Sequence, residues 1–440
     1  MQVILKQKRK YDFICCKKKR LIDAKLRFFY SILTFFLVFA FPLLPGLSSA
    51  KLVMVGLCLY LALKRDSWLK LNKINVNFKK AIRSYLSVHY FLFFWTFFLT
   101  IYYREFDFSL TSMWLSSLIL YYVSFVFYTK ASNYINIPKT IVYCFIFQCL
   151  LILLSMFCDT FYNISSIFRG DVDKIEVYGR LRGTAICGYQ FFGLATMYSF
   201  VLLYYILHIK LFKRKILYFI FLTVFALLNG RFSIVALITG IAFYFIREIL
   251  NGQLKKAISF IVIMIVFIIS LIVLLYYYVD MISDPFLYKV VYNYLVQPLD
   301  SIFIDGEFRT PSTDYLQDMY ESKYIQQFFI WGSGRFMDEA GGYFGSVDAG
   351  YLRILGYYGI IGFIFVFFSL FYLIFLTRSN LDIFTKIAFF CLFLAFNYKG
   401  DVQVYHNNII PLMVAFLFFN KATDLSLIHI SEPTRPISIS

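Results

Sequence analysis

The sequence predicts an all-α polytopic membrane protein with about twelve transmembrane helices, and three observations lead to this prediction. Hydrophobic residues make up 60% of the chain and charged residues only 15%, whereas soluble domains are about half apolar and a quarter charged. The mean hydropathy is +0.71, and the apolar residues fall into runs that approach the ~20 residues needed to cross a hydrocarbon core of ~30 Å. Basic residues gather at alternate ends of these runs, which is the pattern that orients membrane helices.

The apolar runs follow one another through most of the chain, usually with short connections between them. The predicted spans are 28–44, 47–63, 85–103, 110–128, 140–157, 191–207, 216–228, 232–246, 258–279, 360–376, 387–396 and 409–419. The eleventh is the weakest because Asn397 and Lys399 interrupt it, so ten to twelve spans are compatible with the pattern.

The basic stretch from Lys6 to Arg27 places the N-terminus in the cytoplasm, because Lys and Arg that flank membrane spans are retained there. With strict alternation, most of the 43 basic residues face the cytoplasm and most of the 25 acidic residues face outward. The net charge of +18 is therefore a topology signal that predicts contact with anionic lipids. It does not indicate nucleic-acid binding, since the basic residues lie in loops beside the membrane.

The predicted organisation is a basic cytoplasmic arm, 1–27, followed by a transmembrane domain, 28–424. Two long outward segments, 158–190 and 280–350, interrupt this domain. Long loops on a rigid bundle are where functional sites are commonly built, so we expect the function to lie there.

Three further features concern the first span, two cysteines and the last segment of the chain. The first span has the features of a signal peptide, but with so many spans behind it we interpret it as an uncleaved anchor. Cys158 and Cys187 flank the first outward segment, so a disulfide between them is one alternative. The last segment, 425–440, resembles the translation of a sequencing adapter and has no weight in the prediction.

Arg231 is the first candidate functional residue. It follows Asn229 and Gly230 between two predicted spans of about 13 and 15 residues, which rise only ~20 Å against a ~30 Å core. A turn between such short helices lies below the membrane surface, where a cation is costly unless it lines a polar cavity. The alternative is that both helices extend into flanking basic residues and that Arg231 is an ordinary interface anchor.

A second cluster, Tyr178 to Gly183, precedes the sixth span on the outer side and contains Arg180 and Arg182. Positive charge here opposes the general charge bias, and the guanidinium fork suits phosphate oxygens, so the pair predicts an anionic ligand. The alternative is a surface salt-bridge cluster with nearby acidic residues, namely Asp171, Asp173 and Glu176. Two aspartates without a third ligand do not make a metal site, so no metal is predicted.

The third segment runs from Trp331 through Arg335 to Asp348, Arg353 and a glycine-rich span. Its glycines permit close backbone approach to a ligand or tight packing of the loop. An aspartate at the mouth of the tenth span can act as a general base toward a sugar hydroxyl or can cap the helix. Taken alone, the residues around Asp348 favour the cap.

In this order and in these topological positions, the segments resemble the O-antigen ligase and polymerase superfamily. That family has an Arg-x-x-Gly before a mid-chain span, a Gly/Ser-Arg at an outer hairpin, a large outer loop, and a Gly-x-Gly followed by a polar residue that leads into a glycine-rich span. The matching positions are Arg180 to Gly183, Gly230 and Arg231, Gly332 to Gly334, and Asp348 to Gly362. Each motif is short, and the resemblance extends over about 159–376.

The resemblance implies a reaction at the outer face of the bacterial cytoplasmic membrane on a polyprenyl-pyrophosphate-linked oligosaccharide, without a nucleotide sugar, a metal or another cofactor. Arginines would hold the pyrophosphate as its charge develops. The catalytic residues it implies are Asp348, Arg231 and Arg180, and the substrate-binding residues are Arg182, Arg335 and Arg353. It also implies a chain-length regulator and a flippase as candidate partners.

Ligases of this family carry His-Asn where this chain has Asp348 and Ala349. This departure favours a polymerase of oligosaccharide repeat units for O-antigen, capsule or exopolysaccharide. The alternatives are a ligase-type glycan transferase, or a flippase or transporter of lipid-linked glycan. The lack of an internal repeat and the long late loop disfavour a transporter.

Overall fold

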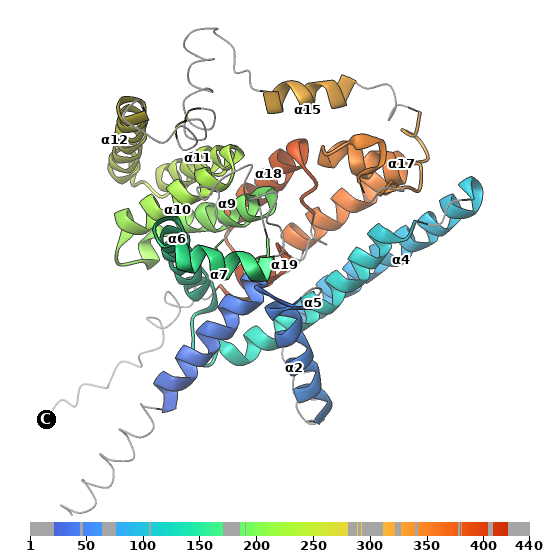
Figure 1. Ribbon diagram of the computed structural model, residues 1–440, viewed down its shortest axis with the longest axis horizontal. Coiled ribbons are helices and arrows are strands. Elements are labelled where there is room, and N and C mark those ends of the chain that lie inside the picture. The colour runs from blue at the N-terminus through green and yellow to red at the C-terminus, as the bar shows by residue number, and fades with distance from the viewer. Residues whose placement is uncertain are drawn as a thin grey trace, which may run out of the picture.

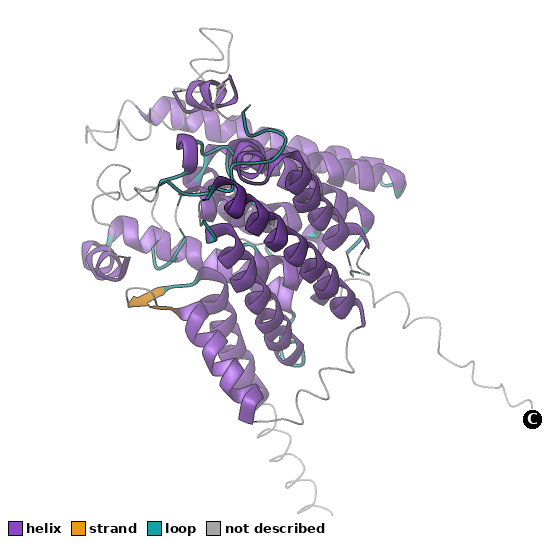
Figure 2. Cartoon of the chain, turned by 90° about the vertical axis from the view of Figure 1, so that its right-hand side faces the viewer, coloured by secondary structure: helices purple, strands orange, loops and turns teal. Residues whose placement is uncertain are grey.

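A computed structural model of the chain describes residues 22–44, 47–63, 76–104, 107–169, 185–189, 191–279, 288, 292, 311–321, 327–338, 342–376, 379, 381–403 and 408–420. This part of the chain is almost entirely helical (Figure 2). Four helices in it are long and apolar enough to cross a membrane, and several shorter apolar helices accompany them. The protein therefore has the all-α architecture of a membrane-embedded chain.

The described chain begins with a helix over 22–39, and two short strands and a series of helices follow it. These are β1 (Pro42–Leu44), β2 (Leu47–Ser48), α2 (Ser49–Leu63), α4 (Val76–Tyr103), α5 (Ser109–Ala131), α6 (Ile137–Phe157), α7 (Asp159–Arg169), α9 (Phe191–Leu207), η2 (Ile209–Leu211), α10 (Lys215–Asn229), η3 (Arg231–Ser233), α11 (Ile234–Leu250), α12 (Leu254–Val279), α15 (Pro311–Glu321), η6 (Phe344–Ser346), α17 (Gly350–Phe371), η7 (Tyr372–Leu376), α18 (Ile383–Lys399) and α19 (Ile410–Phe419). Each predicted span overlaps one of these helices.

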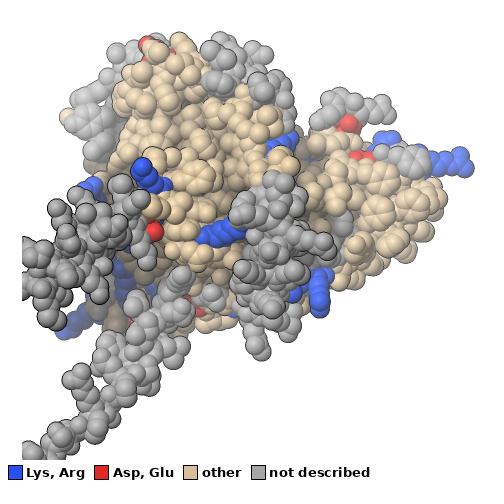
Figure 3. Space-filling model, turned by 90° about the horizontal axis from the view of Figure 1, so that it is seen from below, with Lys and Arg blue, Asp and Glu red and all other residues tan. Residues whose placement is uncertain are grey.

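The centre of the bundle is α9, on which α6, α10, α11, α18 and α19 pack (Figure 1). Every residue of α9 from Leu194 to Leu207 is buried, and a helix that is apolar on all sides is stable only where neighbouring helices or lipid cover it. On the face seen from below, Lys and Arg side chains are scattered over a surface that is otherwise mostly uncharged where it is visible (Figure 3). The bundle thus has an apolar interior around α9.

Two elements lie toward the edge. The long helix α12 packs on α11 at one side of the bundle (Figure 1). The short helix α15 contacts the bundle through Met319 and Leu316, which pack with Val347 and Ala349 just before α17. The Tyr320 hydroxyl donates a hydrogen bond of 2.9 Å to the Tyr398 carbonyl oxygen near the end of α18. This contact places a helix of the 280–350 segment directly beside the start of α17.

The prediction that Asn397 and Lys399 interrupt the eleventh span is wrong as a statement about the helix, since α18 continues to Lys399. The Asn397 amide donates to the carbonyl oxygens of Phe393 and Val402, at 2.7 Å each. Its side-chain oxygen accepts from the Val402 backbone N–H at 3.1 Å. A buried amide whose hydrogen bonds are satisfied, here by α18 and by the segment that follows it, does not end the helix.

Two predicted span boundaries also change. The tenth helix, α17, begins at Gly350 and not near 360, and it is bent at Gly359, whose φ is 68° and ψ −173°. The first predicted span loses its last residues to β1, because Pro42 cannot continue a helix. The alternative disulfide is absent as well, since Cys158 and Cys187 are both free.

Candidate functional site

Asp348 stands where α17 meets the end of α18. Gly350, two residues later, lies so close to α18 that an added Cβ would be 2.5 Å from the Gly400 carbonyl oxygen. The N-cap of α17 is Ala349, and no side chain caps the helix. The interpretation of Asp348 as a helix cap is therefore wrong, and its exposed carboxylate is left for another role.

The groups around Asp348 come from α17 and from the end of α18. Crowding by protein atoms raises the pKa of Asp348 above its ordinary value. Arg353 and Lys399 act in the opposite direction, and the nearby carboxylate of Asp401 raises the pKa further. Because the side chain remains exposed, water moderates this shift. A carboxylate with a raised pKa is a stronger base than an ordinary aspartate.

Arg353 projects from the first turn of α17 between two aromatic rings. Its guanidinium carbon is 3.5 Å from the centroid of Tyr343 and 4.3 Å from that of Phe336, an arrangement that favours a cation. Within the described residues, no acceptor lies in hydrogen-bonding reach of its buried Nε–H. The two rings therefore hold the Arg353 guanidinium in place while its Nε–H can still donate to a further acceptor.

Arg335 lies over a third ring, with its guanidinium carbon 5.6 Å from the Phe344 centroid. Arg335 and Arg353 together line a cavity of about 10 Å³, which has room for about one water and not for a sugar. The structure thus brings these two predicted substrate-binding arginines together, in a closed arrangement.

The segment that carries Arg335 is fixed to the bundle by Asp107, which precedes α5. One carboxylate oxygen of Asp107 accepts from the backbone N–H groups of Phe336 and Met337, at 2.5 and 3.0 Å. Its backbone carbonyl oxygen accepts from the Tyr357 hydroxyl at 2.8 Å. Partial burial alone would raise the pKa of Asp107, but these hydrogen bonds and those from Ser109 outweigh it and hold the pKa below its ordinary value.

Residues 329–334, directly before Arg335, lie against the bend of α17. Gly332 and Gly359 pack backbone to backbone, both with positive φ. The Ser333 and Gly334 N–H groups donate to the Gly356 and Tyr357 carbonyl oxygens, at 2.7 and 3.0 Å, and the N–H of Ile360 donates to Phe329 at 2.8 Å. The loop therefore satisfies backbone groups that the bend takes out of the helix.

Arg231 lies in η3, the turn between α10 and α11, and is half-buried. The turn packs on α9, since an added Cβ at Gly230 would be 2.6 Å from Ala195 Cβ. With 15 residues, α10 rises about 22 Å, short of a ~30 Å core, whereas the η3 turn and α11 together, residues 231–250, are long and apolar enough to cross it. The length of α10 favours a position of Arg231 below the membrane surface, whereas the 231–250 span favours the alternative of an interface anchor.

The residue after Arg231 connects this turn to the site at Asp348. The Phe232 ring packs edge-to-face on Phe396 of α18, with centroids 5.1 Å apart. Lys399 Nζ lies 6.0 Å from the Phe232 centroid and also acts on the pKa of Asp348. The end of α18 thus lies between the Arg231 turn and the start of α17.

No family model, curated protein or solved structure matches the chain. The geometry of the residues is therefore the basis for its functional interpretation. Arg180 and Arg182, the remaining two predicted site residues, lie outside the described residues. The nearest described part of their loop, 185–189, is held by a 2.9 Å hydrogen bond from the Gly188 N–H to the Phe39 carbonyl oxygen.

Lys399 and Asp401 were not predicted as site residues, although both lie beside Asp348. A signal was present in the sequence, since Asn397, Lys399, Asp401 and Gln403 alternate along a short segment between two apolar runs. Such a polar segment predicts only a loop as long as the helix that packs on it is unknown. Only the packing of α17 on α18 reveals that it faces Asp348.

Proposed function

We propose that the chain polymerises polyprenyl-pyrophosphate-linked oligosaccharide repeat units into O-antigen, capsule or exopolysaccharide. It does so in the bacterial cytoplasmic membrane through about twelve spans, with its N-terminus in the cytoplasm and the 158–190 and 280–350 segments outside. The observation that carries the proposal is the meeting of an exposed carboxylate, Asp348, with the cations Arg353 and Lys399 next to the Arg231 turn. A base beside several cations suits glycosyl transfer from a diphosphate donor.

In the proposed reaction the acceptor sugar hydroxyl attacks the anomeric carbon of the donor sugar. The new glycosidic bond forms as the bond from that carbon to the pyrophosphate oxygen breaks, and its electron pair leaves on the polyprenyl pyrophosphate. Asp348 takes the proton from the hydroxyl. Arg231, assisted by Arg353 and Lys399, holds the departing pyrophosphate, whose negative charge increases in the transition state. Arg180, Arg182 and Arg335 bind the same lipid-linked substrates in this proposal.

Deletion of the gene tests the proposal in the cell. A polymerase deletion is expected to leave single repeat units exposed at the cell surface, because export and attachment continue without chain growth. The glycan is measured by gel electrophoresis and by surface labelling of intact cells. Accumulation of the lipid-linked unit on the cytoplasmic leaflet would identify a flippase instead, and full-length polymer left on its lipid carrier would identify a ligase.

The pH dependence of polymerisation tests Asp348 as the base. Activity requires the ionised carboxylate, so it is expected to fall as pH decreases through the pKa of Asp348, at a higher pH than for an ordinary aspartate. Lys399→Gln removes a cation that lowers this pKa, so it shifts the acid limb to higher pH. Asp401→Asn removes a carboxylate that raises it and shifts the limb to lower pH. The profile is measured with purified protein in proteoliposomes.

The matched control is Asp318→Asn, which removes an exposed carboxylate from α15. It is expected to leave the acid limb in place. If Lys399→Gln and Asp401→Asn shifted the limb in the same direction, or left it unmoved, Asp348 would not be the titrating base.

A further inference from the structure

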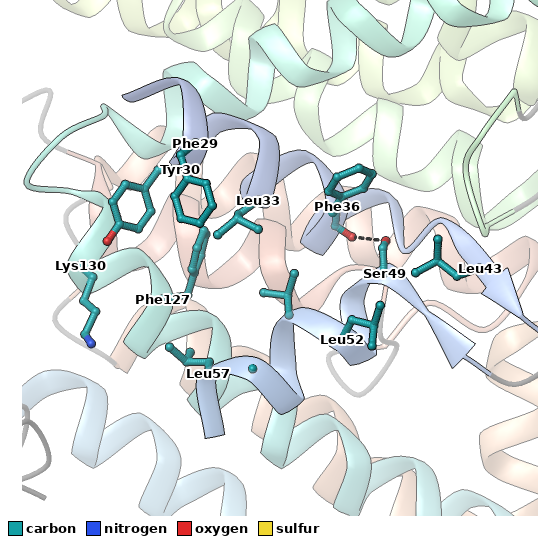
Figure 4. A pocket seen from close by; sticks show the side chains of 12 residues that line it. Phe29, Tyr30, Leu33, Phe36, Leu43, Ser49, Leu52, Leu57, Phe127 and Lys130 are labelled. Atoms are coloured by element: carbon teal, nitrogen blue, oxygen red, sulfur yellow. Dashed lines mark hydrogen bonds between the residues drawn. The ribbon is translucent and has the colours of Figure 1, made fainter. Parts of the chain in front are cut away.

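An apolar groove of about 630 Å³ lies between the helix over 22–39, α2 and α5 (Figure 4). This volume is within the range of sites that bind small organic ligands. Phe29, Leu33 and Phe36 line one wall, three or four residues apart on one face of the first helix. The hydroxyl of Ser49 donates to the Phe36 carbonyl oxygen at 2.8 Å, so even this polar group faces protein. The walls thus suit a hydrocarbon chain.

The groove has one positively charged end. Lys130, in the last turn of α5, lies with Tyr30 and Phe127 at one end, and Leu43 and Ser49 lie at the other (Figure 4). Exposed Lys25 and Arg27 lie within about a turn of Phe29 on the first helix, and the sequence before this helix is strongly basic. Each cation near the membrane surface favours an anionic head group.

The charged end is remote from the site around Asp348. Ser109 and Lys130 mark the two ends of α5 and are 21 residues apart, or about 32 Å along the helix. Asp107, which fixes the Arg335 segment, is at the Ser109 end. A diphosphate held by Lys130 would therefore be about the thickness of a hydrocarbon core away from the arginines. A lipid-linked sugar whose diphosphate is held by Lys130 therefore cannot react at the Asp348 site.

From the apolar walls, the basic end and this separation, we propose that the groove binds an anionic phospholipid of the leaflet at which the first helix begins. Its acyl chain lies along α2 and the first helix, and its phosphate is at Lys130. Such a lipid fills the space between these helices and holds the first hairpin against α5. The proposal is independent of the glycan chemistry.

Gly56 supplies a sharp test, because an added Cβ there meets no atom within 4 Å and Gly56 lines the groove. The Gly56→Phe variant is expected to fill the groove and lose the bound lipid. Lys130→Gln is expected to keep the lipid but to reduce the preference for phosphatidylglycerol over phosphatidylcholine about fivefold, the change that corresponds to about 1 kcal/mol. Lipid retention is measured by native mass spectrometry after reconstitution in nanodiscs of both lipids.

Two controls change the same wall outside the groove. Val55→Phe adds the same ring at an exposed position of α2. Lys51→Gln removes an exposed charge near the beginning of α2, away from Lys130. Both are expected to retain phosphatidylglycerol as the unchanged protein does. Equal retention by Gly56→Phe, an unchanged preference in Lys130→Gln, or displacement of phosphatidylglycerol by equimolar polyprenyl phosphate would overturn the proposal.

Discussion

Replacing Arg231 with alanine is expected to reduce polymer formation by at least about 100-fold, the effect of removing one donor that stabilises developing negative charge. Arg231 is half-buried in the turn between α10 and α11, next to a lysine that reaches toward Asp348. Arg231→Lys is expected to restore activity only in part, because an ammonium lacks the guanidinium fork. Polymer length is measured by gel electrophoresis of surface glycan at matched membrane levels of protein.

The control for this experiment is Arg214→Ala at the opposite end of α10. Arg214 is exposed and its side chain does not cap the helix, so its removal is expected to leave polymer formation unchanged. Full-length polymer from Arg231→Ala would remove Arg231 from the site, and with it the proposed grip on the pyrophosphate.

Replacing Gly359 with alanine is expected to destabilise the protein by about 4 kcal/mol or more. The backbone at Gly359 has φ 68° and ψ −173°, a region that is nearly restricted to glycine and costs other residues about 1–3 kcal/mol. An added Cβ would also overlap the Ile330 carbonyl oxygen. The loop would have to withdraw from α17, which breaks the hydrogen bonds from Ser333, Gly334 and Ile360 at about 1 kcal/mol each.

This loss is measured in detergent as a lower temperature of unfolding and as faster tryptic cleavage after Arg335, which the junction partly shields. Gly252→Ala separates the two causes. Gly252 also has a positive φ, 70°, but no atom lies within 4 Å of an added Cβ. It is expected to cost only about 1 kcal/mol and to leave cleavage after Arg335 unchanged. Equal effects at both glycines would show that the contact between the loop and α17 contributes nothing.

Much of the fold could be predicted because hydrophobicity is a local property of the chain. The runs that became α6 and α9 were predicted to within a few residues, since each is apolar for long enough to require burial in protein or lipid. The predicted span boundaries were wrong where contacts with distant residues determine the structure. Asn397 was taken as an interruption because its hydrogen-bond partners were unknown. Residues 350–359 were placed outside the tenth span, although they form the first part of α17.

The candidate site was predicted less completely. Arg231 was predicted from its charge between two short apolar runs, because a cation near hydrocarbon is costly and therefore conspicuous. Asp348, Arg335 and Arg353 were predicted as site residues through the family resemblance. Lys399 and Asp401 were missed, since each is unremarkable in a short connection. Their relevance depends on a distance across the fold, and no local pattern carries it.

The sequence by itself determined that this is an all-α chain of apolar helices and which charged residues stand out from them, because both follow from the cost of placing polar groups in an apolar medium. Only the tertiary structure decided that α18 ends against the start of α17, that Gly332 lies on Gly359, and that a groove opens between the first helix and α5. These arrangements depend on how side chains from distant segments fill space together, which is a property of the packed molecule.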